Sequence, residues 1–159
     1  MTRKLQAVAV LLLVFSTMAW AQGQDPFVGT WKQNMAKSKF DPASQTPKGP
    51  TTIKREAAPN GGLHVISEGT DPQGKPTRSE YTAKYDGKDY PVTGSANYDT
   101  ESFTRIDSNT RIIVYKKGSN VVRMQRQVVA KDGKSSTNDD FGAYANSAPF
   151  HNVSVFDKQ

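Results

Sequence analysis

Short segments in which apolar and polar side chains alternate follow one another from residue 51 to the end of the chain. Turn sequences such as Asn60-Gly61 and Asp86-Gly87 separate them. Alternation with a period of two is typical of strands that have one face on a core, and Asn-Gly or Asp-Gly between two such runs favours a tight hairpin. The spacing leaves no room for the helical crossovers that parallel strands need. The pattern therefore predicts an antiparallel meander.

About ten strands fit this pattern. Many strands with one polar and one apolar face must close into a barrel or fold into a sandwich, because an open meander would leave long unpaired edges. We therefore predict an all-β fold, a single antiparallel up-and-down β-barrel of about ten strands. The expected strands are 27–33, 51–57, 63–68, 77–85, 88–92, 100–107, 110–116, 121–129, a weak one at 135–141, and 151–157.

The segment 34–50 interrupts the pattern, because it contains Pro42, Pro47 and Pro50. Proline has no N–H to donate to a ladder, so this segment is not expected to form a central strand. We expect a long loop that covers one end of the barrel, with a single helical turn at 35–39. No helix longer than about two turns is expected in the rest of the mature chain.

Residues 1–21 have the features of a cleavable export signal. Arg3 and Lys4 give a positive start, the run from Ala7 to Phe15 is apolar, and Ala19-Trp20-Ala21 matches the small-x-small cleavage pattern. This run and every later apolar stretch are shorter than the roughly 20 residues that a membrane-spanning helix needs. We therefore expect residues 22–159 to form one exported domain, periplasmic or secreted, without a transmembrane segment.

Composition excludes several kinds of chemistry. The chain contains no cysteine, so disulfides, thiolate metal sites and cysteine nucleophiles are impossible. The net charge of +6 decreases when Arg3 and Lys4 are removed. The basic residues are scattered and lack the interleaved aromatics of a nucleic-acid surface, so no specific nucleic-acid binding is expected. Weak attraction to anionic lipid or polysaccharide through charge alone stays open.

No catalytic or metal-binding arrangement is visible in the sequence. Phosphate-binding glycine loops, His-x-x-x-His spacing and nucleophile elbows are all missing. The two histidines, His64 and His151, lie on different expected strands, and Asp139-Asp140 lacks the spaced oxygen ligands of a calcium loop. We therefore predict a protein that is not an enzyme and that uses no metal or cofactor.

Two expected strands place an arginine on an apolar face. In 121–129, Arg126 has the same parity as Met124, Val122 and Val128. In 100–107, Arg105 has the parity of Phe103, although the opposite parity stays open. A guanidinium inside a barrel is costly without a partner, so it would either hold a structural carboxylate or bind an anionic ligand.

Tyr81 and Tyr85 also share one face of their strand, where they would form an aromatic stripe on the wall. Together with the two strands above, this stripe defines the candidate ligand-binding set. Its members are Arg126, Arg105, Met124, Phe103, Tyr81 and Tyr85.

The two ends of the mature chain carry a resemblance to a known family. Phe27-Val28-Gly29-Thr30-Trp31-Lys32 resembles the first-strand Phe-x-Gly-x-Trp-Lys signature of the calycins, which include lipocalins and intracellular fatty-acid-binding proteins. The last residues, 155–159, resemble the closing strand of those proteins, which ends in an aromatic, an acid and a lysine. The resemblance implies a barrel in which the glycine bends the first strand and Trp31 plugs the floor.

A more specific likeness covers most of the mature chain. Both ends, with Lys37-Ser38-Lys39-Phe40 and the run 81–94, resemble a group of secreted bacterial proteins of unknown function. This likeness implies no activity. Fatty-acid-binding proteins hold the ligand carboxylate with an arginine and a tyrosine on the last strand, where this chain has Ser154 and Phe156. The segment 34–50 also replaces the helix pair of that family, so fatty-acid binding does not transfer.

The sequence therefore favours an exported calycin-like barrel that binds a small hydrophobic or amphiphilic molecule in its interior. Arg105 and Arg126 are the candidates for any anionic group of that molecule. The alternative is an envelope or matrix interaction protein with a filled barrel, which acts through its surface. A cavity of about 300 Å³ or more, apolar with a few converging polar groups, would favour the first role.

Overall fold

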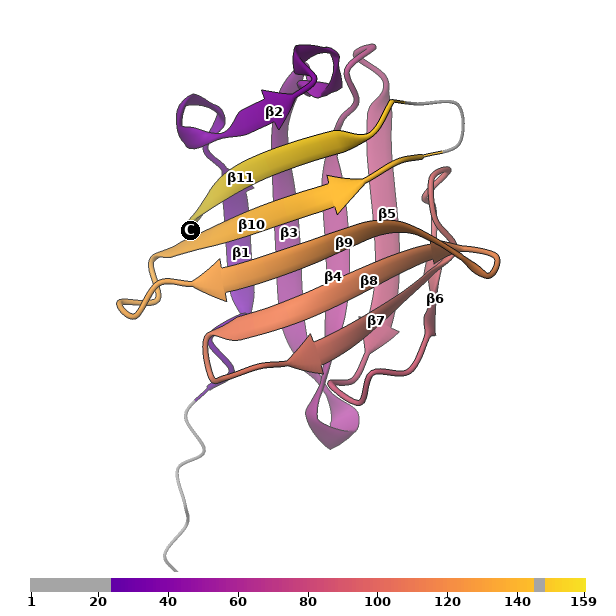
Figure 1. Ribbon diagram of the computed structural model, residues 1–159. Coiled ribbons are helices and arrows are strands. Elements are labelled where there is room, and N and C mark those ends of the chain that lie inside the picture. Colours follow the sequence, from indigo (N-terminus) through magenta and orange to yellow (C-terminus); the bar gives the residue numbers. More distant parts are fainter. Residues whose placement is uncertain (1–23, 145–147) are drawn as a thin grey trace, which may run out of the picture.

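The computed structural model describes residues 24–144 and 148–159. Ten antiparallel strands close into a barrel (Figure 1), which confirms the predicted fold class. The predicted export signal, residues 1–21, lies outside the described residues. Within the described ranges, no helix is both long and apolar enough to cross a membrane.

From β3 onward each barrel strand pairs with the next one along the chain, and β1 closes the barrel by pairing with both β3 and β11. At the closure, Trp31 lies opposite Ile53 of β3 and Lys158 of β11. The barrel strands are β1 (Gly29–Gln33), β3 (Gly49–Ala58), β4 (Gly62–Thr70), β5 (Pro76–Ala83), β6 (Tyr90–Thr93), β7 (Thr100–Arg105), β8 (Thr110–Lys117), β9 (Asn120–Val129), β10 (Ser135–Gly142) and β11 (Phe150–Lys158).

The segment 34–50 is more regular than predicted. The expected helical turn forms as a 3-10 turn, η1 (Met35–Lys37), and a second turn is η2 (Ala43–Gln45). Between them β2 (Lys39–Asp41) pairs with 151–153 of β11, so β1 and β2 occupy successive stretches of one edge. The prediction of a covering loop is wrong for these three residues, which form a short strand. They precede Pro42, whose missing N–H ends the pairing.

Left-handed backbone conformations occur where the sequence provides glycine or asparagine. At the β3–β4 turn, within η3 (Pro59–Gly61), Asn60 and Gly61 have φ of 60° and 76°. These residues adopt that region at the lowest cost, so the predicted hairpin forms there. Gly29 at the start of β1 has φ of 131°, a conformation that other residues rarely adopt.

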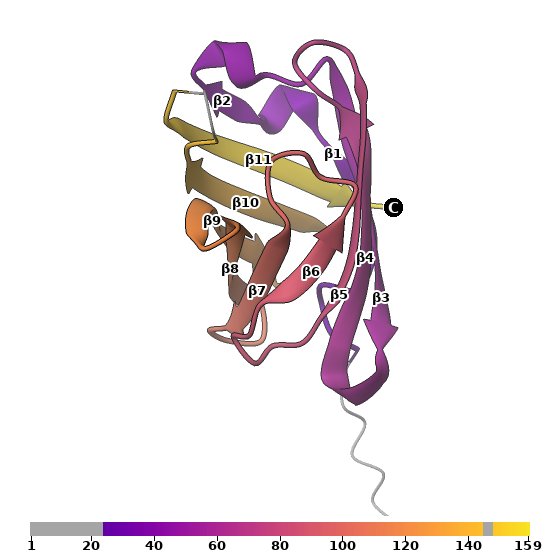
Figure 2. The same cartoon turned by 90° about the vertical axis from the view of Figure 1, so that its right-hand side faces the viewer.

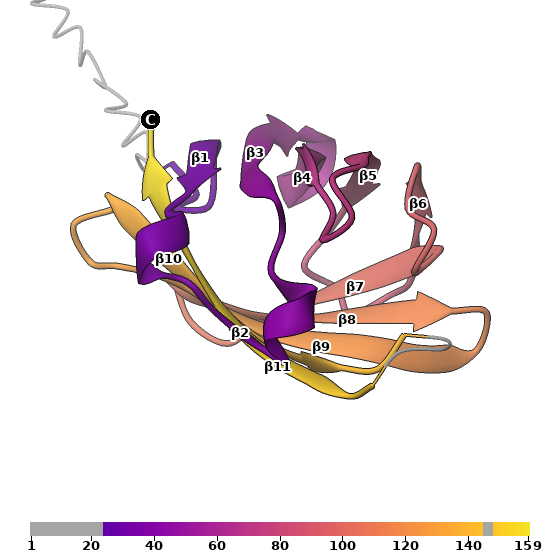
Figure 3. The same ribbon diagram turned by 90° about the horizontal axis from the view of Figure 1, so that it is seen from above.

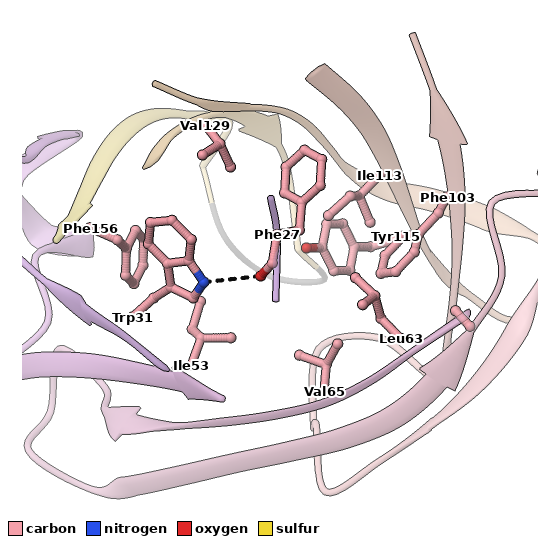
Figure 4. Close-up of a cluster of buried hydrophobic side chains, with 11 residues drawn as sticks. Phe27, Trp31, Ile53, Leu63, Val65, Phe103, Ile113, Tyr115, Val129 and Phe156 are labelled. Carbon is pink, nitrogen blue, oxygen red and sulfur yellow. Dashed lines mark hydrogen bonds between the residues drawn. The ribbon is translucent and has the colours of Figure 1, made fainter. Parts of the chain in front are cut away.

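One end of the barrel interior is filled with apolar side chains (Figure 4). Phe27 and Trp31 are fully buried there, and the indole N–H of Trp31 donates to the Phe27 carbonyl oxygen at 3.0 Å. We call this region the closed end. It consists of Phe27, Trp31, Leu63, Ala83, Phe103 and Val129.

The strands form two walls that face each other across the interior, with β3–β5 on one side and β8–β11 on the other (Figures 2 and 3). The η2 turn lies at the end of the barrel opposite to the β3–β4 turn (Figure 2). The two walls position the side chains of the site described next.

Candidate ligand-binding site

A cavity of about 640 Å³ occupies the half of the interior beyond the closed end. Its mouth is bordered by residues of the η2 region, of the β4–β5 turn and of the β6–β7 loop. Small-molecule sites usually have about 300–1,000 Å³. The barrel interior is therefore not filled, and the cavity has the size of a ligand site.

The wall on β9 and β10 is polar and internally hydrogen-bonded. Gln127 of β9 pairs in register with Asn138 of β10, and its Nε2 donates to Asn138 Oδ1 at 2.8 Å. Next to them Gln125 pairs with Asp140, and its Nε2 donates to Asp140 Oδ1 at 2.7 Å. These side chains are buried because each finds its partner on the neighbouring strand.

Arg123 and Asp140 form an ion pair in the same wall. Arg123 Nε and Nη2 each lie 2.7 Å from Asp140 Oδ1, and the guanidinium stacks 4.4 Å from the ring centroid of Tyr115. Burial raises the pKa of Asp140, and the positive charge of Arg123 opposes this shift. The pair is thus nearly neutral and carries little net charge into the cavity.

Arg111 lies at the boundary between the cavity and the closed end. It is fully buried, and its Nε donates to Gln127 Oε1 at 2.7 Å. Its guanidinium carbon lies 4.4 Å from the ring centroid of Phe27 and 4.3 Å from that of Phe103. No carboxylate of the described residues forms an ion pair with this cation. Its positive charge therefore extends into the cavity.

Arg55 is the least satisfied cation of the interior. It projects from β3 into the cavity and is 3% exposed, yet its buried Nε and Nη1 have no hydrogen-bond partner among the described residues. Burial and the repulsion from Arg111 lower the pKa of Arg55 to about 9, so the group is still charged at neutral pH. A buried charge without a partner costs several kcal/mol. Arg55 is therefore available to bind an anion through these two N–H groups.

Glu101 does not neutralise these cations. It is fully buried on β7, outside the cavity lining, and neither carboxylate oxygen has a hydrogen-bond partner within residues 24–144 and 148–159. Burial raises the pKa of Glu101 to about 8, a shift that Arg111, Tyr81, Arg123 and Arg55 partly oppose. At neutral pH the group is mostly protonated, and the interior keeps an excess of positive charge.

The structure separates the six predicted site residues. Tyr81 lines the cavity, whereas Phe103 is fully buried in the closed end. Asp25 Oδ2 accepts hydrogen bonds from Arg105 Nη2 at 2.6 Å and from the Tyr85 hydroxyl at 2.8 Å. Phe103 is buried and Arg105 lies on the same face, so the structure decides the parity that the sequence left open. However, Arg105 and Tyr85 hold the segment before β1 and do not line the cavity.

The parity predicted for the strand 121–129 is wrong. Met124 is 49% exposed and Arg126 is also exposed, so both point outward. The opposite parity places Arg123, Gln125 and Gln127 inside. The three inward polar side chains can be buried because they hydrogen-bond to partners on β8 and β10. These hydrogen bonds offset the cost of leaving Met124 exposed on the outer face.

Sequence reasoning missed the cations that the cavity contains. The signal for Arg55 was its parity with the buried Ile53, two residues earlier on β3. Arg111 likewise shares its parity with Ile113 and Tyr115 on β8. In each strand the residues of one parity are buried, and an arginine among them follows the same face.

The histidines lie on β4 and β11, each beside a carboxylate. His64 Nε2 is 3.0 Å from Glu80 Oε1, and His151 Nε2 is 2.7 Å from Asp139 Oδ1. In the part of the chain that the structure describes, no three histidine or acidic side chains gather as a metal site would require.

Comparison with known proteins reveals no relative, since no family model, no curated protein and no solved structure matches the chain. The closed ten-strand barrel is compatible with a calycin-like fold. Membership of that family stays a prediction that rests on the motifs at the chain ends.

Proposed function

We propose that this chain is an exported, calycin-like, non-enzymatic protein that binds a small, partly apolar molecule with an anionic group inside its barrel. One observation carries the proposal. The buried guanidinium of Arg55 faces a cavity of about 640 Å³ with two N–H groups that no described residue accepts.

The chemistry of the cavity supports both parts of such a ligand. An anion beside Arg55 would accept charge-assisted hydrogen bonds and would also be attracted by Arg111. Apolar surface for the rest of the molecule comes from Ile53, Val65 and Ile113, which line the same cavity. Burial of that surface adds affinity without requiring further polar partners.

Native mass spectrometry of the protein purified from its own host tests for a bound molecule directly. In vitro, we expect cyclohexanecarboxylate to bind more tightly than its neutral amide. Arg55→Met should weaken the acid about tenfold or more and leave the amide unchanged, because a charge-assisted hydrogen bond contributes about 1.5–3 kcal/mol. Arg126→Met, on the outer face, is the matched control. Equal affinities of the acid for wild type and Arg55→Met would contradict the proposal.

Export is tested separately by N-terminal sequencing of the protein recovered from the host envelope or medium. We expect the mature chain to start at Gln22, directly after the small-x-small pattern. A chain that retains residues 1–21 in the cytoplasm would contradict the exported role but not the binding chemistry.

A second role, through the outer surface, is favoured by exposed apolar side chains on β9 and β10. Val121, Met124 and Phe141 are each about half exposed and border a depression of about 240 Å³. If this surface binds an envelope partner, the double variant Met124→Ser with Phe141→Ser would lose its retention in the envelope fraction. Arg55→Met would keep it.

A further inference from the structure

Asp140 presents a free hydrogen-bond acceptor to the cavity. Its Oδ1 accepts the hydrogen bonds from Nε of Arg123 and Nε2 of Gln125, and Nη2 of Arg123 forms its ion-pair contact with the same oxygen. Oδ2 accepts none within the described part of the chain, although the side chain is 5% exposed and lines the cavity. An ionised carboxylate oxygen only accepts, so a ligand that satisfies Oδ2 must supply a donor.

Asn138 presents a free donor beside it. Its Oδ1 accepts from Gln127 Nε2, whereas its Nδ2 donates to no described residue. Asn138 is 3% exposed, lines the same cavity, and stands two residues before Asp140 on the inward face of β10. The two Cα positions are therefore about 7 Å apart, within the length of one small ring with its substituents.

A hydroxyl group fits this pair better than an ammonium group does. Arg123 already neutralises Asp140, so a second cation would find little uncompensated negative charge there. A hydroxyl both donates and accepts, and neighbouring hydroxyls could serve Asp140 Oδ2 and Asn138 Nδ2 together. The tyrosines Tyr81 and Tyr115 in the lining offer ring faces and edges against which a ring with polar substituents can pack.

The wall opposite β10 supplies a group that can bind the anionic part of the ligand. Arg55 projects from β3, which faces β9–β11 across the interior (Figure 3), and it requires an anion. We infer, resting on the proposed function, that the ligand class is a polyhydroxylated acid such as a sugar acid. Its acid group binds Arg55, and its hydroxyl groups bind Asp140 and Asn138. This assignment differs from an apolar amphiphile, which would leave the β10 groups unsatisfied.

Three probes that share a ring of the same size separate the two contributions in calorimetric titrations. D-glucuronate has both the acid and the hydroxyls, D-glucose lacks the acid, and cyclohexanecarboxylate lacks the hydroxyls. We expect glucuronate to bind at least about tenfold more tightly than either of the others, because each hydrogen-bonding end contributes about 1.4 kcal/mol or more.

Asn138→Ala tests the β10 groups without disturbing the charge pair. Gln127 Nε2 keeps an acceptor in this variant, Ser136 Oγ at 3.2 Å, so the fold should survive. We expect the affinity for glucuronate to fall about fivefold while that for cyclohexanecarboxylate is unchanged. Asn120→Ala, at the exposed first residue of β9, is the matched control. Thermal unfolding of each variant verifies that it is folded.

The possible results separate the inference from the proposed function. If cyclohexanecarboxylate binds at least as tightly as glucuronate, or if Asn138→Ala leaves both affinities unchanged, the inference is overturned and the proposed function stands. If glucose binds as tightly as glucuronate, the acid is irrelevant and both are overturned. If neither acid binds at millimolar concentration, both are overturned as well.

Discussion

The closed end and the cavity half of the barrel differ in how completely their polar groups are satisfied. At the closed end the N–H of Trp31 reaches the Phe27 carbonyl, and Asp25 accepts from both Arg105 and Tyr85. Across the cavity, Arg55 leaves two buried N–H groups without partners. Buried polar groups in native proteins are almost always hydrogen-bonded, so exceptions indicate strain or function.

This difference suggests that the closed end stabilises the fold and that the cavity half binds a ligand. A domain of this size is stable by about 5–15 kcal/mol, and one unpaired buried charge removes several kcal/mol of that margin. The closed end supplies apolar burial and satisfied hydrogen bonds, while unpaired buried atoms remain on Arg55 in the cavity, on Arg111 at its boundary and on Glu101 of β7. Local violations of good packing chemistry are expected at functional sites. The following substitutions test this division, from the largest expected effect to the smallest.

Trp31→Ala should cost about 3–5 kcal/mol of unfolding free energy, because it removes a fully buried indole from the closed end. Urea titration followed by circular dichroism measures the loss. Phe141→Ala, which truncates a half-exposed aromatic side chain on β10, should cost less than about 1 kcal/mol. A loss below about 1 kcal/mol for Trp31→Ala would show that the closed end is not the stabilising half.

Asp140→Ala should destabilise the protein by about 3 kcal/mol, since it leaves Arg123 buried without its counter-charge. Asp139→Ala removes the neighbouring carboxylate, which pairs with the half-exposed His151 on the outer side, and should change stability by less than about 1 kcal/mol. The same urea titrations compare the two variants. Equal losses would mean that the interior position of the Arg123–Asp140 pair has no energetic consequence.

Glu101→Gln should stabilise the protein at neutral pH by up to about 3 kcal/mol. Burial raises the pKa of Glu101 from its ordinary 4.5 to about 8, so the folded state holds a proton that the unfolded state releases in this window. The stability contributed by this group is fully present below pH 4.5 and is lost as the pH rises toward about 8. Glu101→Gln does not titrate, so this variant does not lose stability in this way as the pH rises.

Urea titrations at several pH values between 4 and 9 measure this linkage. The advantage of Glu101→Gln over wild type should grow with pH and level off above about pH 8. Glu68→Gln, at an exposed position of β4, should show no such growth. A pH-independent difference for Glu101→Gln would contradict the raised pKa.

Arg126→Met should change neither stability nor ligand affinity by more than about 0.5 kcal/mol, because the side chain is exposed on the outer face of β9. Unfolding and calorimetric titrations of this variant, beside those of Arg55→Met, sharpen the contrast between an outer and an inner arginine. A large loss of affinity for Arg126→Met would reverse the assignment of the two faces of β9.

The strand count could be predicted from sequence because it depends on local patterns, and the closure of the barrel because an open meander would leave long unpaired edges. Alternation with period two and the Asn-Gly or Asp-Gly turns mark each strand and its ends. Even the weak pattern around 135–141 forms a strand, β10. The terminal motifs also placed Trp31 correctly at the junction of the first and last strands, where it pairs with Lys158.

The candidate site could be predicted only in part. Of the predicted residues Tyr81 lines the cavity, whereas Arg126 was chosen because its parity includes Met124 and the valines, and Arg123 was missed. Period two divides a strand into two faces but does not say which face is inside when both contain polar and apolar residues. On β9 that choice depends on partners supplied by other strands.

The sequence by itself therefore determined the approximate positions of the ten barrel strands and the turns that connect them, since turn chemistry and alternation act between near neighbours. That the two ends of the chain meet was predicted from the motifs at those ends. Tertiary structure alone decided which polar groups are buried. Gln127 is stable inside because Arg111 on β8 and Asn138 on β10 lie within hydrogen-bond distance. Arg55 on β3 has no such neighbour among the described residues. The energy of a buried polar group is set by partners that are distant in sequence, and only the closed barrel brings them together.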